Sequence, residues 1–457
     1  MRKITQIIII FLFSITLVFS ENAKEKADEV FTVGKFAENL TETITKNGLD
    51  AGLALFADVP ESFADDYSIN YMHASLLVSA QKPVEAEKIA LELLNKNPDN
   101  LDVLFLNVMI CKMQGKLNQK RKYLEAILKI DPANSDANAE MGNEKMLAKA
   151  YADAKSYYLK SFKNNPKYTT GLFGFGQACY YLGDFDEAKA AFKSILSISP
   201  KEDIAYSYLA KVDAETGDYD TAIEYILKAI EYNPDYYNYW IDYGDYLRFS
   251  TKYEEAAKVF SKAIEIDPDY FLGYLYRGGM YEYTEKYDEA LADYKKVVSL
   301  NPQYYYAYES IGILAWNKKD WKECRVAFQK AYEKNPKNIS YQLMISACYL
   351  REKNLTKNKE FLNKMLKNYD RSTVEYVVLR LYLDGLGDVD ALRKVRAVES
   401  RNLRGKLLYY MGLFYDLYGG MEQAEKLYLE VKDMKAPMFF EYRLCEWALA
   451  EYGLEDV

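Results

Sequence analysis

A proline recurs every 34 residues through most of this chain, at positions 98, 132, 166, 200, 234, 268, 302 and 336. Between Tyr237 and Tyr270, two runs with helical apolar periodicity, Tyr239–Phe249 and Tyr253–Ile266, surround a short polar turn and end at Pro268. Because proline disfavours helical geometry in the residue before it, the second run must stop there. The period predicts stacked two-helix hairpins, none of which could bury its apolar stripes alone.

Two positions of this unit carry mostly small residues, which would let two antiparallel helices approach closely. The eighth position holds Ala74, Val108, Gly142, Gly176, Ala210, Gly244, Gly278, Gly312 and Ser346. The twentieth holds Ala86, Lys120, Ala154, Ala188, Ala222, Ala256, Ala290, Cys324 and Asn358. Together with the large residues at positions four and twenty-four and the proline, this pattern resembles the tetratricopeptide repeat. The resemblance implies an all-α, right-handed superhelix of about eleven or twelve helical hairpins with a C-terminal capping helix.

The resemblance covers nearly the whole chain after its first residues and suggests five segments. Residues 1–20 are a predicted signal peptide, 21–66 hold N-terminal helices and a degenerate capping repeat, and 67–372 hold nine 34-residue units. Residues 373–438 form two further degenerate units, and 439–457 a C-terminal capping helix. In the unit that starts at residue 101, Val108 and Lys120 replace small residues, so its helices are expected to splay or shift.

The first twenty residues have the layout of an exported protein. A basic start, Arg2 and Lys3, precedes an apolar run from Ile7 to Phe19 that is shorter than the ~20 residues needed to span a bilayer. We therefore expect a cleaved signal peptide and a location in the periplasm or cell envelope of a bacterium, without a membrane span after cleavage. An uncleaved anchor is the alternative.

Charge and composition disfavour several classes of function. The formal net charge of −9 disfavours nucleic acid and anionic membranes as partners, since both need Lys and Arg against phosphates. The single histidine, His73, nearly eliminates histidine-dependent catalysis and histidine-rich metal sites. No phosphate-binding loop, HExxH, CxxC or G-x-S-x-G motif occurs. We predict a protein that is not an enzyme and holds neither cofactor nor metal.

The five cysteines are most simply interpreted as small core residues. Cys111 and Cys179 occupy the same position two units apart, too far for a disulfide. Cys324 and Cys348 fall on neighbouring helices and are the one pair for which a disulfide stays open.

Partner binding is expected on the first helix of each unit. Positions 2, 5, 9 and 12 form a stripe offset from the packing stripe, and in the family that this chain resembles the stripe lines a concave groove that holds peptides or partner segments. The predicted groove residues are Phe105, Met109, Phe173, Tyr180, Lys211, Ile241, Asp245, Arg248, Leu275, Tyr306 and Trp316. Their aromatic and apolar character favours an interface, and the alternative is that neighbouring first helices bury them.

The leading hypothesis is a non-enzymatic scaffold, exported to the cell envelope, that binds a segment of a protein or peptide partner in this groove. Two alternatives stay open, a solute-binding accessory component of a transport system and an accessory subunit of an envelope-modifying enzyme. The sequence leaves the oligomeric state undetermined.

Overall fold

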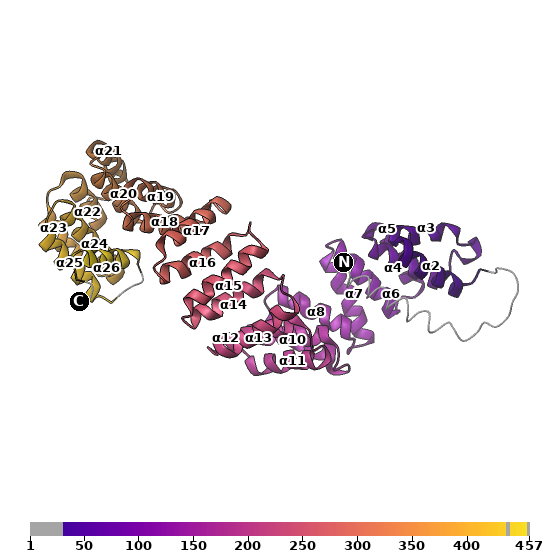
Figure 1. Cartoon of the computed structure of the whole chain (residues 1–457). Helices are drawn as coiled ribbons and strands as arrows, with labels where there is room; N and C mark the ends of the chain where they lie inside the picture. The colour runs from indigo at the N-terminus through magenta and orange to yellow at the C-terminus, as the bar shows by residue number, and fades with distance from the viewer. Residues whose placement is uncertain (1–30, 436–438, 455–457) are drawn as a thin grey trace. The chain divides into compact units, whose positions relative to one another are not determined.

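The structure is a computed structural model that describes residues 31–435 and 439–454, so the predicted signal peptide lies outside the described residues. It divides into two compact units, Met1–Val212 and Asp213–Val457. All regular structure in the described ranges is helical. Helices α2 to α25 follow one another as twelve antiparallel pairs, and α26 follows the last pair (Figure 1). This confirms the predicted all-α fold of consecutive helical hairpins.

The helices keep the register of the 34-residue period. The first unit contains α2 (Val33–Asn47), α3 (Leu49–Ala54), α4 (Tyr67–Ser79), α5 (Pro83–Lys96), α6 (Leu101–Met113), α7 (Leu117–Ile130), α8 (Ser135–Leu147), α9 (Tyr151–Lys163), α10 (Thr169–Leu182), α11 (Phe185–Ile198) and most of α12 (Asp203–Glu215). Three short 3-10 helices also occur, Leu55–Asp58 and Glu61–Phe63 after α3 and Leu366–Asn368 after α21.

The second unit continues the same alternation and ends with shorter hairpins. It contains α13 (Tyr219–Tyr232), α14 (Tyr237–Phe249), α15 (Tyr253–Ile266), α16 (Phe271–Tyr283), α17 (Tyr287–Leu300), α18 (Tyr305–Asn317), α19 (Trp321–Lys334), α20 (Ile339–Arg351), α21 (Leu355–Met365), α22 (Val374–Asp384), α23 (Asp388–Arg396), α24 (Arg401–Leu417), α25 (Met421–Asp433) and α26 (Phe440–Glu451).

Small residues at the eighth position let a large ring of the second helix reach the first helix. A Cβ atom added to Gly244 would lie 2.4 Å from Cε1 of Phe260, and one added to Gly312 would lie 2.7 Å from Cε2 of Phe328. Both rings are fully buried. The glycines are therefore required by close packing between the helices of a hairpin, not by an unusual backbone conformation.

The turn inside each regular hairpin has one fixed backbone geometry. The fifteenth residue of the unit lies in the left-handed region in all nine units, with φ values such as +69° at Gly115, +81° at Gly183 and +80° at Gly217. The positive φ expected at these glycines is confirmed. Six other units hold a non-glycine residue there, including Thr251 at φ +59°, which strains a β-branched side chain.

Two departures from the repeat pattern are accommodated by polar partners. Val108 is fully buried, and the buried side chain of Lys120 directs its ammonium group to Glu140, with Nζ 3.1 Å from Oε2. Helices α6 and α7 still pack together as a hairpin. In the unit that starts at residue 339, the buried hydroxyl of Ser346 donates to Oδ1 of Asn358 at 2.7 Å. A hydrogen-bonded pair thus stands where most units pair two small apolar residues.

The last third of the chain packs differently from the regular hairpins. Helices α20 to α26 gather in one group in Figure 1, and a single apolar core runs from Ile313 on α18 to Leu449 on α26. Helix α20 is enclosed, because each residue from Ile339 to Tyr349 is buried. The side chain of Arg351 at its C-terminal end forms an ion pair with Asp416 of α24.

Helix α26 covers the last hairpin and also reaches back along the chain. It packs on α24 and α25, as expected for a capping helix. It also contacts α18, and its Arg443 forms an ion pair with Glu282 of α16. Its Trp447 lies edge-on to Tyr287 of α17, with ring centroids 5.4 Å apart. The helix therefore packs against repeats that precede it by more than a hundred residues.

Candidate functional site

In the first unit, three predicted groove residues converge around one tyrosine. Phe173 and Tyr180 of α10 lie edge-on to Tyr208 of α12, with ring centroids 5.3 and 6.1 Å away. Nζ of Lys211 lies 5.6 Å from the centroid of the same ring. Nε2 of Gln177 donates to the Tyr208 hydroxyl at 2.7 Å. We call Phe173, Gln177, Tyr180, Tyr208 and Lys211 the α10–α12 cluster.

The α10–α12 cluster is partly exposed and anchored from below. All five side chains are half-buried, whereas Phe192 of α11, which stacks on Tyr208 at 5.0 Å, is fully buried. The rings are thereby held in place by the hairpin core while part of each faces outward. Aromatic rings on a rigid helical base, with a cation beside them, have the composition of a protein-binding surface.

Sequence reasoning missed Tyr208, because it occupies the sixth position of its unit and lies outside the predicted stripe. The residues at the sixth position of the other regular units range from Leu106 to Glu140 and Gly174, so one sequence gave no signal there. The position contacts the preceding first helix, which brings Tyr208 against Phe173 and Tyr180.

The other two predicted residues of the first unit lie one hairpin pair earlier. Phe105 and Met109 are half-buried on α6, and Phe105 packs against the cluster of Leu104, Val108 and Leu124. They share a helix face and are not part of the α10–α12 cluster. Whether they contact a partner stays a prediction.

The predicted residues in the middle of the second unit are dispersed. Ile241 is buried in the core of α14 and α15, and Leu275 is half-buried beside the next core. Asp245 and Arg248 pair with each other along α14, with Nε 2.9 Å from Oδ1. Tyr306 is 55% exposed and stacks on Tyr305. These side chains do not form one surface, and their contact with a partner also stays a prediction.

Trp316 lies in a cavity formed with the C-terminal helix. The cavity has a volume of about 110 Å³, and α26 contributes Leu444, Trp447, Ala448 and Glu451 to its lining. Trp316 lies edge-on to Trp321 at 4.8 Å, and the guanidinium of Arg351 lies 5.6 Å from the Trp321 ring. Nζ of Lys319 lies 3.2 Å from Glu451 at the rim. The chain's own helix thus occupies the surface beside Trp316.

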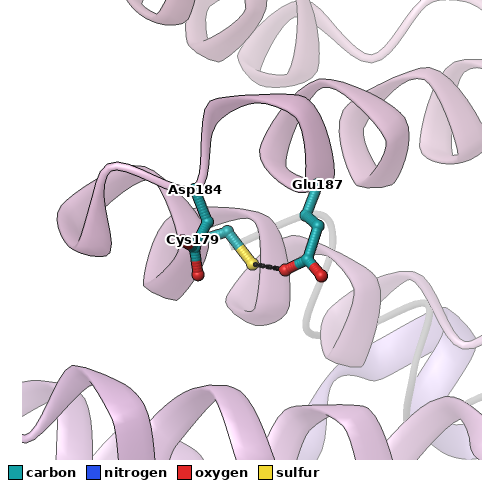
Figure 2. A group of neighbouring side chains, drawn as sticks. All are labelled: Cys179, Asp184 and Glu187. Atoms are coloured by element: carbon teal, nitrogen blue, oxygen red, sulfur yellow. Dashed lines mark hydrogen bonds between the residues drawn. The ribbon is translucent and has the colours of Figure 1, made fainter.

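Cys179, Asp184 and Glu187 gather at the α10–α11 turn (Figure 2), with ligand atoms within 4.8 Å of one another. Lys155 of α9 already neutralises the two carboxylates, with Nζ 2.5 Å from Oδ2 of Asp184 and a second ion pair to Glu187. Burial raises the pKa of the Cys179 thiol to about 12, so the thiolate that a metal requires is disfavoured. The arrangement fits an ionic link between consecutive hairpins.

His73 lies on α4 with its ring stacked on Phe56, at a centroid distance of 4.2 Å and an interplanar angle of 10°. It is half-buried, and burial lowers its pKa. These surroundings agree with the interpretation of His73 as a structural residue.

Models of the tetratricopeptide repeat family match three segments of the chain, residues 180–241, 237–270 and 281–339. The matched segments cover α11 and α13 to α19 in the register described above. The chain is a tetratricopeptide repeat protein. Repeats of this family form scaffolds for protein–protein interaction, and the family attribution confirms the resemblance seen in the sequence.

Other tetratricopeptide repeat proteins match parts of the chain. BBSome complex member BBS4 of Mus musculus is 24% identical over 132 residues, which are 29% of this chain and 25% of BBS4. Anaphase-promoting complex subunit 3 of Schizosaccharomyces pombe is 22% identical over 205 residues, 45% of this chain and 30% of that protein. Hsp70-Hsp90 organizing protein 2 of Arabidopsis thaliana is 28% identical over 142 residues, 31% and 23% of the two chains. The chain spans about a quarter of the length of BBS4.

Solved structures of repeat proteins also align with parts of the chain. A tetratricopeptide repeat protein from Parabacteroides merdae aligns with 54% of this chain and 97% of its own, at 18% identity and a TM-score of 0.41. The magnetosome-named protein MamA aligns with 35% of this chain and 95% of its own, at 27% identity and a TM-score of 0.34. Within residues 31–435 and 439–454, no helix has the length and apolar character needed to cross a membrane.

Proposed function

We propose that the protein is a non-enzymatic scaffold, exported to the cell envelope, that holds a segment of a protein partner on the first-helix surface of its first unit. The first-helix surface is the surface formed by the first helix of each hairpin. The α10–α12 cluster supports this proposal most directly. Three rings from two successive first helices share one contact there while each keeps part of its surface exposed.

The cost of binding would be low at the α10–α12 cluster. Side chains that are free in solution lose rotamer entropy when a partner fixes them, and that loss reduces affinity. Tyr208 is already fixed by Phe192 and Gln177, and Phe173 lies 5.9 Å from the Phe192 ring. A partner would therefore contact a preorganised aromatic surface, which favours binding by a few anchor residues.

The second unit offers less of this surface. Trp316 at the twelfth position of its unit lines a cavity with α26, and Glu282 at the twelfth position of the preceding unit pairs with Arg443 of α26. The twelfth position is the position that Tyr180 occupies in the first unit. A partner segment would have to displace α26 to reach these two residues, which makes the first unit the favoured binding region.

Site-specific photo-crosslinking tests the binding surface in the full-length protein. A photoreactive amino acid would replace Lys211 in the α10–α12 cluster or, as a control, Lys193, which is exposed on the second helix α11. In envelope extracts of the source cells, we expect one discrete protein adduct from position 211 and none from 193. The same adducts from both positions would contradict the proposal.

The predicted export needs a separate test. The full chain and a variant without residues 1–20 would each carry a C-terminal tag and be expressed in a bacterium. We expect the full chain to shorten and to leave the cytoplasm, and the variant to stay inside. A full chain that stays in the cytoplasm at its original mass would contradict export but not partner binding.

A further inference from the structure

Cys324 and Cys348 face each other at the junction of two hairpins. Cys324 is on α19 and Cys348 on α20, and their Sγ atoms lie 3.3 Å apart, with the Cys348 thiol donating to the Cys324 sulfur. Both side chains are fully buried. Beside them, Nε of Arg325 donates to Glu352 at 2.9 Å, which ties the same two helices together. The two thiols are thus held in contact by a packed helix pair.

The same contact elsewhere in the chain is purely apolar. One unit earlier, the equivalent positions hold Ala290 and Leu314, both fully buried in one cluster. Two units earlier they hold Ala256 and Met280. An alanine and a larger apolar residue therefore satisfy this packing position, and packing alone does not require two thiols.

The three remaining cysteines have other surroundings. Cys179 donates to Glu187 at 3.5 Å, and Cys445 donates to the carbonyl oxygen of Tyr428 at 3.0 Å. Cys111 is buried on α6, in the first unit. Of the five cysteines, all within the described residues, Cys324 and Cys348 are the two whose sulfur atoms are in contact.

We propose that Cys324 and Cys348 form a disulfide that covalently joins the hairpin α18–α19 to the hairpin α20–α21. An S–S bond is about 2.05 Å long, so the sulfurs need a shift of roughly 1 Å to close it. The bond would fix the place where the regular hairpins meet the C-terminal core. Partner binding plays no part in this inference, so either proposal can fail while the other holds.

The oxidant is a disulfide of a small thiol or of a thiol–disulfide exchange protein. The thiolate of one cysteine attacks a sulfur of the donor and forms a mixed disulfide, which releases the first donor thiol. The second cysteine, as thiolate, attacks the protein sulfur of that mixed disulfide and releases the second donor thiol. The two cysteines lose two electrons and two protons, and the donor gains them as two thiols.

The exchange takes place before the two hairpins close on each other. Both thiols are fully buried in the folded chain, so the donor disulfide reaches them during folding or on local opening. Once formed, the bond is shielded by the same burial. We therefore expect oxidation to be efficient on refolding and slow when a donor is added to the folded, reduced protein.

Refolding in a glutathione buffer tests the disulfide. Full-length protein is reduced in denaturant, refolded with reduced and oxidised glutathione, alkylated under denaturing conditions, digested and analysed by mass spectrometry. We expect the peptides containing Cys324 and Cys348 to be joined, with loss of two hydrogens, and Cys111, Cys179 and Cys445 to be alkylated. Five alkylated cysteines, or a different pair, would overturn the proposal.

Variants connect the bond to stability. The oxidised protein should melt about 5 °C above the same sample after reduction, because the bond restricts the unfolded chain. Cys324→Ala introduces the residue that most repeats hold at this position and should abolish both the joined peptides and the effect of reductant. Cys179→Ala should keep both. An unchanged effect of reductant in Cys324→Ala would contradict the assignment.

Discussion

The regular hairpins and the C-terminal part of the second unit bury their apolar residues in different ways. Around α14 and α15, one small core joins Leu247, Ala256 and Phe260 to Met280 of the next hairpin. In the C-terminal part, a single core connects α18 through α26. A regular hairpin therefore depends on its immediate neighbours, whereas the C-terminal helices depend on partners far away in sequence.

Long-range polar contacts distinguish the C-terminal part further. The Tyr410 hydroxyl donates to the carbonyl oxygen of Ser340, 70 residues away, at 3.1 Å, and Arg351 pairs with Asp416. Both contacts enclose α20, whose equivalents in regular hairpins keep an exposed face. The comparison teaches that one repeat pattern can build open hairpins or a closed core, depending on whether later helices fold back over the first helices.

The largest expected effect comes from removing the ring that each hairpin core is built around. Phe260→Ala and Phe328→Ala should each cost about 3–5 kcal/mol, since both rings are fully buried. Because Phe328 also contacts Phe440 of α26 and Tyr341 of α20, its loss should weaken the whole C-terminal core. Hydrogen exchange should rise from α14 to α16 in the first variant and from α18 to α26 in the second. Equal spread in both would contradict the comparison.

A methyl group added between the helices of a hairpin should have the next largest effect. Gly244→Ala places Cβ 2.4 Å from the Phe260 ring and should cost about 1–3 kcal/mol in denaturant unfolding. Gly279→Ala is the matched control, because its nearest neighbour would be 4.0 Å away and alanine favours the helix. Equal stability of the two variants would show that the ring yields without cost.

The attachment of α26 to the earlier repeats should depend on Arg443. Arg443→Met keeps an apolar chain but leaves the largely buried Glu282 unpaired, which should cost about 1–2 kcal/mol. Lys426→Met is the control, because Lys426 and its partner Glu422 are both exposed. We expect faster exchange in α26 only for Arg443→Met, and unchanged exchange there would argue against docking on α16.

Glu441 should make the C-terminal core sensitive to pH. Its side chain is fully buried, with Oε1 accepting from the Tyr410 hydroxyl at 3.0 Å, and burial raises its pKa. The folded state therefore keeps a proton that the unfolded state loses above about pH 4.3, so this residue reduces stability as pH rises through its folded pKa.

Glu441→Gln removes this titration. The variant should gain melting temperature relative to the wild type as the pH rises, by an amount corresponding to about 1 kcal/mol. At pH 3, where both states of the wild type are protonated, the difference should be smallest. Melting curves from pH 3 to 8 provide the measurement, and a difference that does not vary with pH would contradict a raised pKa.

The smallest expected effect concerns the turn geometry that the regular hairpins share. Thr251 holds φ +59° although it is β-branched, so Thr251→Gly should stabilise its hairpin by up to about 1 kcal/mol. Gly183→Thr, at φ +81° in the same position of another unit, should have the opposite sign. Chemical unfolding of both variants tests the pair, and a shared sign would mean that backbone strain does not dominate.

The sequence determined most of the regular array and little of the closed core. The proline period and the small residues at two positions placed the helices of each hairpin, and α15 begins and ends where predicted, at Tyr253 and Ile266. These features are local, so one chain is enough to detect them. The departures at Ser346 and Asn358 were visible as exceptions, but their mutual hydrogen bond depends on which side chains meet across two helices.

The candidate site was predicted in part for the same reason. Helical periodicity put Phe173, Tyr180 and Lys211 on one stripe, but only the packing of α10 against α12 brings them to Tyr208. The sequence also gave no sign that α26 would contact Trp316, because an amphipathic helix does not reveal which of several apolar surfaces it will cover.

Native-state hydrogen exchange of the full-length protein tests the central claim most directly. If the C-terminal helices form one closed core, amides of α20, α24 and α26 should exchange with a common, high opening free energy, while α14 and α15 open separately and at lower free energy. Exchange of α26 at low free energy while α20 stays protected would contradict this account, because α26 would then be a detachable cap and the surface beside Trp316 would be open to a partner.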